Sequence, residues 1–425
     1  MTCNKYINID STMSIDTVLE YMKNGNIFLT GAPGSGKTWI TRQYINYCLA
    51  NYKTNNIGIT ASTGIAAKLL NGTTIHSWSG IDIVESTDTF DLILKRVLAK
   101  STHVKRWKNA QVLIIDEISL LDCKIFSFLD LIGQTIRSNK NPFGGIRVLV
   151  VGDFYQLPPV NGSFCFNCEN NLWENTFNHM INLTTSYRSN DDKLNRILKR
   201  IRKSKPLLPN MIKALKKRNS KKVLTNDRYP ILVPLRDMAR NINNKKLEEN
   251  TTKEYIFNAS YNKPEIKTTI QKLSPLEDRL VLKVGCPVIY LINEHTRGLV
   301  NGMVGTITDF INNKPIVVFN NREYVVDKHV WNKNDINCNL SMEQFPLLLA
   351  YSITIHRSQG QTLSQASIVL DSRIWEKSQS YVALSRLVSL EGLNLLEFDP
   401  NIFNILRPND TIVKKYYQKW NIIKS

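Results

Sequence analysis

The stretch Gly31-Ala-Pro-Gly-Ser-Gly-Lys-Thr38 decides the fold of this chain. The run before it, Asn26–Thr30, is mostly apolar and has the composition of a buried strand. The residues after it, 37–49, repeat apolar side chains at helical spacing. A strand, a glycine-rich loop and a helix in this order form a phosphate-binding loop. The sequence therefore predicts an α/β fold with a nucleotide site at this loop.

The residues of this loop are expected to share the contacts to the nucleotide. Glycines let backbone N–H groups turn onto the phosphates, at the positive end of the following helix. Lys37 should reach the β- and γ-phosphates, and the Thr38 hydroxyl should bind Mg²⁺. The loop residues expected to bind the nucleotide are Gly31, Ala32, Pro33, Gly34, Ser35, Gly36, Lys37 and Thr38.

Acidic residues end a second apolar run. Val112–Ile115 has the composition of a strand buried on both faces, and Asp116 and Glu117 follow it. Asp116 can hold the Mg²⁺ shell, and Glu117 can orient or deprotonate the attacking water. Two surface acids that cap a strand are the alternative, which the phosphate loop disfavours. At the tip of a third strand, Gln156 can reach the γ-phosphate or its water.

Length and charge limit the class of protein. The chain has 425 residues, enough for two or three domains, and no apolar stretch approaches the length of a membrane span. A net charge of +19 predicts attraction to a polyanion, with nucleic acid as the leading candidate and a generally basic proteome as the alternative.

The seven scattered cysteines indicate free thiols in a reducing compartment. The first residues lack a signal or transit pattern, so we expect a nuclear or cytoplasmic protein, or one in a viral replication compartment.

Several segments have side chains suited to a single nucleic-acid strand. Residues 59–67 and 72–78 are rich in small hydroxyl side chains, which suit phosphates, although ordinary helix starts would look similar. Later apolar runs, 347–363 and 380–387, show no second phosphate loop. One nucleotide site would therefore serve two lobes, and the second lobe should supply a cation, for which Arg386 and Arg188 are candidates.

Taken together, these motifs resemble the PIF-type DNA helicases, a RecD-like branch of helicase superfamily one. The matching stretches run in family order from residue 26 to about 390, and they are "GAPGSGKT", "TASTGIAA", "GTTIHSW", "LIIDEISLLD", "PFGGIRVLVVGDFYQLPPV", "LTTSYRS", "RGLVNGMVG", "AYSITIHRSQGQTL" and "SYVALSR". The resemblance implies an ATP-hydrolysing motor that moves 5′-to-3′ on single-stranded DNA and unwinds duplexes during replication, repair or recombination. It also implies two RecA-like lobes. From residue 280 to about 340, short β-runs split by Gly and Asn turns predict a small β-barrel inserted in the second lobe, which the resemblance describes as SH3-like.

The resemblance assigns roles to individual positions. Lys37, Glu117, Gln156, Arg188 and Arg386 would be catalytic, the two arginines as fingers and Gln156 as the γ-phosphate sensor. Asp116 and Thr38 would hold the metal. Gln359 and Gly360 would lie near the nucleotide. The residues that would face DNA are Thr63, His76, Phe154, His356 and Ser358. The family's adenine-reading Gln has no clear counterpart around residues 15–19, which leaves base selectivity open.

The expected organisation places the first lobe at residues 1–180, the second lobe at 181–284 and 345–425, and the barrel at 285–344. The chain lacks the long N-terminal extension of many cellular members, so we expect a compact core. Expected partners are single-stranded DNA and forked or tailed duplex, with no membrane, and a monomer is expected, with a DNA-induced dimer as the alternative. An RNA helicase, a translocase without unwinding, and a nucleotide-gated DNA clamp remain as other functions.

Overall fold

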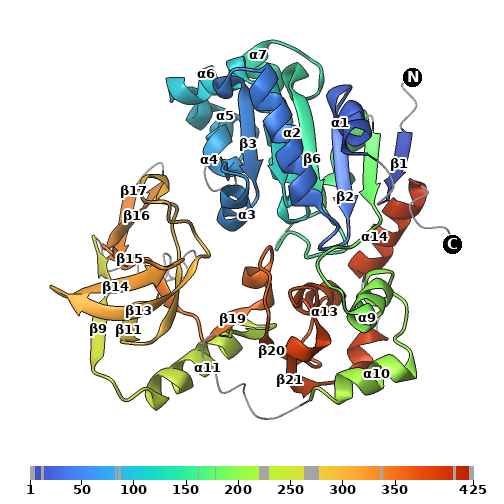
Figure 1. The fold of residues 1–425 in the computed structure, drawn as a ribbon. Helices are drawn as coiled ribbons and strands as arrows, with labels where there is room; N and C mark the ends of the chain where they lie inside the picture. The colour runs from blue at the N-terminus through green and yellow to red at the C-terminus, as the bar shows by residue number, and fades with distance from the viewer. Residues whose placement is uncertain are drawn as a thin grey trace.

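The computed structural model describes most of the chain (Figure 1). The described residues are 5–10, 14–81, 84, 88–160, 162–177, 179–219, 229–262, 277–335, 338–404 and 408–420. Within these ranges, no helix combines the length and the apolarity needed to cross a membrane.

A seven-stranded parallel sheet forms the centre of the first lobe. Its strands are β1 (Lys5–Ile9), β2 (Ile27–Gly31), β3 (Ile57–Ala61), β4 (Thr73–Thr74), β5 (Val112–Asp116), β6 (Arg147–Gly152) and β7 (His179–Leu183). They lie in the order β1-β7-β2-β6-β5-β3-β4, so the phosphate loop leaves a strand in the middle of the sheet. Ligands of such sheets bind beyond the carboxyl ends of the strands, which is where the loop begins.

Helices cover both faces of this sheet (Figure 1). Alternate residues explain why. In β5, Ile114 packs with α2 (Lys37–Asn51) on one face, while Leu113 and Ile115 pack on the other face with α5 (Phe90–Leu98), α6 (Ser101–Asn109) and α7 (Cys123–Arg137). The helices of the lobe are α1 (Ile15–Lys23), α2 (Lys37–Asn51), α3 (Gly64–Leu69), α4 (Ile75–Ser79), α5 (Phe90–Leu98), α6 (Ser101–Asn109), α7 (Cys123–Arg137) and α8 (Leu172–Thr176). The predicted α/β fold with a parallel sheet is confirmed.

A smaller parallel sheet, in the order β19-β8-β20-β21, forms the second lobe. Its strands are β8 (Ile231–Val233), β19 (Ser352–Thr354), β20 (Ala366–Leu370) and β21 (Leu393–Phe398). The helices of this part of the chain are α9 (Asp192–Arg202), α10 (Pro209–Lys216), α11 (Arg236–Glu249) and α13 (Lys377–Leu384), with the 3-10 helix η8 (Ile355–Ser358) directly after β19. The chain thus leaves this lobe after α11 and returns to it at β19.

The segment between α11 and β19 is rich in antiparallel strands. They are β9 (Glu254–Asn258), β10 (Ser260–Tyr261), β11 (Arg279–Lys283), β12 (Pro287–Tyr290), β13 (Val304–Ile311), β14 (Lys314–Phe319), β15 (Arg322–Val325), β16 (His329–Asp335), β17 (Cys338–Gln344) and β18 (Leu347–Leu349). Five of them form the sheet β15-β14-β13-β12-β18. A β-rich insertion was expected at 285–344, but the strands begin at Glu254 and end at Leu349, so the insertion is longer. Its likeness to an SH3 barrel stays a prediction.

Two boundaries of the lobes also differ from expectation. The strand β7 pairs with β1 and β2 up to Leu183, so the first lobe continues past residue 180. The last helix, α14 (Pro408–Lys419), was expected in the second lobe but packs on the first (Figure 1). Its Tyr416 accepts a hydrogen bond from Trp173 at 2.8 Å, and its Tyr417 hydroxyl lies 3.0 Å from that of Thr30. Two tyrosines with buried polar partners therefore decide where the helix docks, and chain order does not reveal this.

A buried ion pair connects the first lobe to the helices that follow it. Asp153, directly after β6, is fully buried and lies 3.0 Å from the guanidinium of Arg202 on α9. The ring of Tyr155 lies 4.8 Å from this guanidinium, and the ring of Tyr417, which stacks on that of Tyr155, lies 5.9 Å from it. The Tyr381 hydroxyl of α13 is 3.4 Å from the second carboxylate oxygen of Asp153. Arg202 belongs to the basic stretch 198–206, yet its guanidinium pairs with a buried carboxylate.

We predict that Arg202→Met lowers the free energy of unfolding by about 3–5 kcal/mol, because it leaves the Asp153 carboxylate buried without a partner. Urea unfolding measures the loss. The double variant Asp153→Asn/Arg202→Met should recover much of it, because no unpaired charge remains. Arg240→Met is the matched control: its side chain is 61% exposed, and the loss of its ion pairs should cost less than about 1 kcal/mol. A loss in the Arg202 variant no larger than in the control would contradict a stabilising role for the pair.

Candidate nucleotide site between the two lobes

The phosphate loop is held open by glycines and closed on one side by the segment after β7. Gly34 and Gly36 have φ values of 78° and 89°, which L side chains rarely adopt. A Cβ on Gly34 would also lie 2.2 Å from the Cβ of Arg188. The Gly34 carbonyl accepts a hydrogen bond from the Tyr187 N–H at 2.8 Å. The backbone bearing Arg188 is therefore fixed directly against the loop.

Groups in the loop lack the partner that a phosphate would supply. The Ser35 hydroxyl is buried and has no hydrogen-bond partner among the described residues. Lys37 donates to the carbonyls of Gly31 and Ala32 at 2.8 and 3.1 Å, both within the loop itself. Burial lowers the pKa of Lys37, while Asp153 and Glu117 act in the opposite direction. The uncapped N-terminus of α2 adds its positive dipole, so the site fits a polyphosphate.

The acidic pair lies at the carboxyl end of β5. The Glu117 N–H donates to the Asp116 carboxylate at 2.8 Å, and Glu117 has a φ of 54°, an uncommon conformation for a residue with a side chain. Burial, followed by the nearby Glu117, raises the pKa of Asp116 from 3.8 to about 7. A buried carboxylate with a raised pKa gains from a cation beside it, so the surroundings of Asp116 fit a divalent metal held with the phosphates.

Side chains of the second lobe meet this pair and its neighbours. Gln359, directly after η8, donates to Glu117 at 3.1 Å, and its own amide oxygen has no partner in the described part of the chain. Arg386, directly after Ser385 at the end of α13, lies 3.5 Å from the Gln156 amide oxygen. The structure thus brings together predicted residues that lie more than two hundred positions apart.

Among the described residues, both arginines donate to backbone carbonyls and neither pairs with a carboxylate. Arg386 is fully buried and donates to the carbonyls of Val382 and Gln361 at 2.9 and 3.2 Å. Arg188 donates to the Ser385 carbonyl at 2.8 Å. Burial, then Arg188, lowers the pKa of Arg386 to about 9, and burial lowers the pKa of Arg188. Two guanidiniums in one buried site leave positive charge that an anionic ligand would neutralise.

Gly360 completes this side of the site. A Cβ on it would meet no atom within 4 Å, but its φ is 84°. The backbone conformation, and not lack of space, therefore requires glycine after Gln359.

The residues expected to face DNA divide into two groups. Thr63, His76 and His356 are partly exposed, and the Thr63 hydroxyl accepts the N–H of Ala66 at the start of α3. Phe154 is only 1% exposed and packs edge-on against Trp173 and Phe166 in the core. Ser358 is fully buried and donates to the Ile355 carbonyl at 2.7 Å.

Two of these expectations are therefore corrected. The side chain of Phe154 belongs to an aromatic cluster, because an apolar ring at the end of a central strand is buried by the helices that cover it. The side chain of Ser358 closes the turn of η8 and cannot reach a strand outside the protein as it lies here.

Sequence reasoning missed two residues that the structure places beside predicted ones, Arg202 near Lys37 and Trp375 against His356. Arg202 lies in a run of similar cations, and only its ion pair with the buried Asp153 distinguishes it from its neighbours. Trp375 lies in a loop with no recognisable motif, yet its ring stacks on His356 at 5.7 Å between centroids.

We predict that Asp116→Asn raises the thermal unfolding midpoint of the nucleotide-free protein at pH 8. The folded pKa of Asp116, about 7, lies above its ordinary value of 3.8, so the wild-type protein loses stability as pH rises from about 4 to 7. Asparagine has no charge to lose, so its advantage should be greatest at pH 8 and shrink towards pH 4. Thermal scans across this range test the trend. Asp237→Asn, at a side chain 88% exposed, is the control and should show no such trend. A pH-independent difference for Asp116→Asn would argue against a buried, neutralised carboxylate.

Comparisons with known proteins agree with this geometry. Residues 8–220 match the family model described as PIF1-like helicase. The "ATP-dependent DNA helicase Pif1" of Bdellovibrio bacteriovorus is 35% identical over 393 residues, which cover 90% of this chain and 87% of that protein. The chain spans a smaller share of the yeast, frog and human relatives, 66%, 64% and 59% of their lengths.

Solved structures give the same result. The Pif1 helicase from Candida albicans matches with a TM-score of 0.83 and 29% identity, over 96% of this chain and 99% of that one. Bacteroides Pif1, solved bound to single-stranded DNA, matches with a TM-score of 0.78 and 27% identity, over 96% of each chain. Sequence and structure therefore agree, and the chain belongs to the PIF1-like helicase family.

Proposed function

We propose that this chain is an ATP-dependent DNA helicase that moves 5′-to-3′ on single-stranded DNA and unwinds forked or tailed duplex. The proposal covers replication, repair or recombination, in the nucleus or the cytoplasm. One observation carries it: Gln359, three residues after His356, contacts Glu117 across the lobes at 3.1 Å. A change at the nucleotide can thus reach a surface suited to a nucleic-acid strand through a few bonded residues.

Each group at the site has a distinct role in this proposal. Lys37 and the loop N–H groups bind the β- and γ-phosphates, and Asp116 and Thr38 hold Mg²⁺, which supplies charge neutralisation. Glu117 orients the attacking water and takes its proton. Gln156 senses the γ-phosphate. Thr63, His76 and His356, on both lobes, contact the strand.

Arg188 and Arg386 are proposed as the two arginine fingers. They come from two separate segments, after β7 and after α13, and neither donates a hydrogen bond to a carboxylate among the described residues. Their charge is therefore free to stabilise the negative charge that develops on the transferred phosphoryl group.

We expect single-stranded DNA to stimulate ATP turnover strongly at low salt. Purified chain is assayed with no nucleic acid, with a DNA oligonucleotide and with an RNA oligonucleotide of the same sequence. Lys37→Ala, which removes the phosphate-binding cation, is the control and should lose turnover while it still binds DNA. Substantial turnover that ignores DNA would overturn the motor proposal, and negligible turnover with tight DNA binding would favour a nucleotide-gated clamp. Stimulation by the RNA oligonucleotide and not by the DNA oligonucleotide would show that the substrate is RNA. Unwinding of duplexes that carry either a 5′ or a 3′ single-stranded tail then tests the direction of movement along the strand.

We also expect Arg386→Ala to lower kcat by about a thousandfold while nucleotide affinity changes little, because a finger acts on charge that exists only in the transition state. Steady-state kinetics and binding of a fluorescent ATP analogue separate the two effects. Arg386→Lys keeps a charge but loses the fixed fork that donates to Val382 and Gln361, so it should recover only part of kcat. Equal losses in turnover and affinity would contradict the finger role.

A further inference from the structure

Three residues outside the nucleotide site meet at one edge of the second sheet. The strands β19, β8 and β20 are parallel neighbours, so the residues after each of them share the carboxyl edge. His356 follows β19, Arg236 follows β8, and Trp375 follows β20. These residues are far apart in the sequence, and the pairing of the three strands brings them to the same edge of the sheet.

Trp375 presents an aromatic surface at this edge. The residue is 42% exposed, so part of its large ring is open to solvent. The ring lies nearly parallel to that of His356, with an interplanar angle of 14° and 5.7 Å between centroids. Hydrogen bonds hold its loop in place. The backbone N–H of Trp375 donates to the side-chain amide oxygen of the buried Gln379 at 3.1 Å, and the Gln379 amide nitrogen donates to the Pro234 carbonyl at 3.5 Å. The two rings therefore form a preorganised platform.

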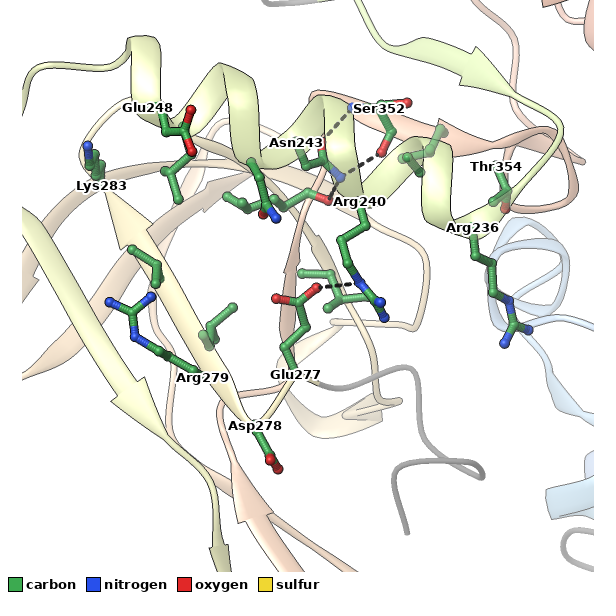
Figure 2. Close-up of a pocket in the computed structure, with 18 of the residues that line it drawn as sticks. Arg236, Arg240, Asn243, Glu248, Glu277, Asp278, Arg279, Lys283, Ser352 and Thr354 are labelled. Atoms are coloured by element: carbon green, nitrogen blue, oxygen red, sulfur yellow. Dashed lines mark hydrogen bonds and ion pairs between the residues drawn. The ribbon is translucent and has the colours of Figure 1, made fainter. Parts of the chain in front are cut away.

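Cations without carboxylate partners lie beside the platform. Among the described residues, neither Arg236 nor Arg357 forms an ion pair. Both line a cavity of about 740 Å³ between α11 and β11, together with Thr354 (Figure 2). Figure 2 shows Arg236 at the end of this cavity near Thr354, whereas Arg240 is turned to Glu277, with which it pairs. Arg236 is thus available to an anion from outside the protein.

We propose that Trp375, stacked on His356, is a platform for one base of the bound single strand and that Arg236 contacts the adjacent phosphate. An exposed ring next to an unpaired cation is the combination by which proteins hold single strands, whose unpaired bases expose their flat faces. A base within a duplex is already stacked on its neighbours and cannot use the ring. This inference rests on the proposed function and adds a residue to its strand-contacting surface.

The platform is also connected to the hydrolytic site. The 3-10 helix η8 carries His356 in its first turn and ends at Ser358, and the next residue, Gln359, donates to Glu117 at 3.1 Å. The hydroxyl of Ser358 closes this turn at 2.7 Å. A base that presses on the platform can therefore act on the position of Gln359 through a short, hydrogen-bonded segment.

The test compares the affinities of an oligothymidylate and of an abasic oligonucleotide of the same length for the full chain. We expect Trp375→Ala to weaken binding of the oligothymidylate about tenfold, the effect of one lost base stack, and to leave binding of the abasic strand unchanged. Trp375→Phe retains a ring and should stay within about threefold of wild type. Arg236→Ala should weaken both ligands alike and reduce the salt dependence by about one phosphate contact. Leu98→Ala, at a residue 48% exposed on α5, is the control and should change neither affinity.

The outcomes separate this inference from the proposed function. If wild-type chain neither binds the oligonucleotide nor increases its ATP turnover with it, the proposed function fails and the platform fails with it. If wild type is stimulated but Trp375→Ala binds oligothymidylate as wild type does, only the platform is overturned. An equal loss on both ligands would mean that Trp375 supports the fold of the loop, and the platform would again be overturned. A far-ultraviolet circular dichroism spectrum and a thermal unfolding midpoint that match those of wild type show that the variant is folded.

Discussion

The buried pair between Asp153 and Arg202 is the interaction on which the site geometry depends. It joins the tip of β6 to α9, and its neighbours Tyr381 and Tyr417 add α13 and α14 to the same network. Gln156 lies three residues beyond Asp153, and Arg386 lies at the end of the helix that carries Tyr381. The contact between Gln156 and Arg386 is therefore positioned from both sides by one charged cluster.

The nucleotide site is assembled from groups that the free protein leaves incompletely satisfied. The Ser35 hydroxyl and the Gln359 amide oxygen are buried without partners in the described chain, and Asp116 has a pKa raised to about 7. Burying such groups costs free energy in the absence of ligand. A polyphosphate with its cation would supply the missing partners and charges at once, so nucleotide binding should draw the two lobes together at this site.

Aromatic side chains serve two separate purposes in this molecule. Phe154, Phe166 and Trp173 pack with Tyr416 and anchor the last helix to the first lobe. Trp375, in contrast, leaves much of its ring exposed on the second lobe and stacks on His356. Residue type is the same in both places, and burial alone distinguishes a core ring from one that can hold a base.

The sequence by itself determined the features that depend on neighbouring residues. The phosphate loop, the strand before Asp116 and the β-rich insertion all follow from local spacing, because strand, turn and helix signals act over a few positions. Only the tertiary structure decided the extent of the insertion and the docking of α14. It also decided the burial of Phe154, Ser358 and Arg202. The same holds for the meeting of Arg236, His356 and Trp375, which are brought together by strand pairing. Such contacts arise from packing between segments that are far apart in the sequence. A local sequence pattern does not specify which distant segment will pack on a residue.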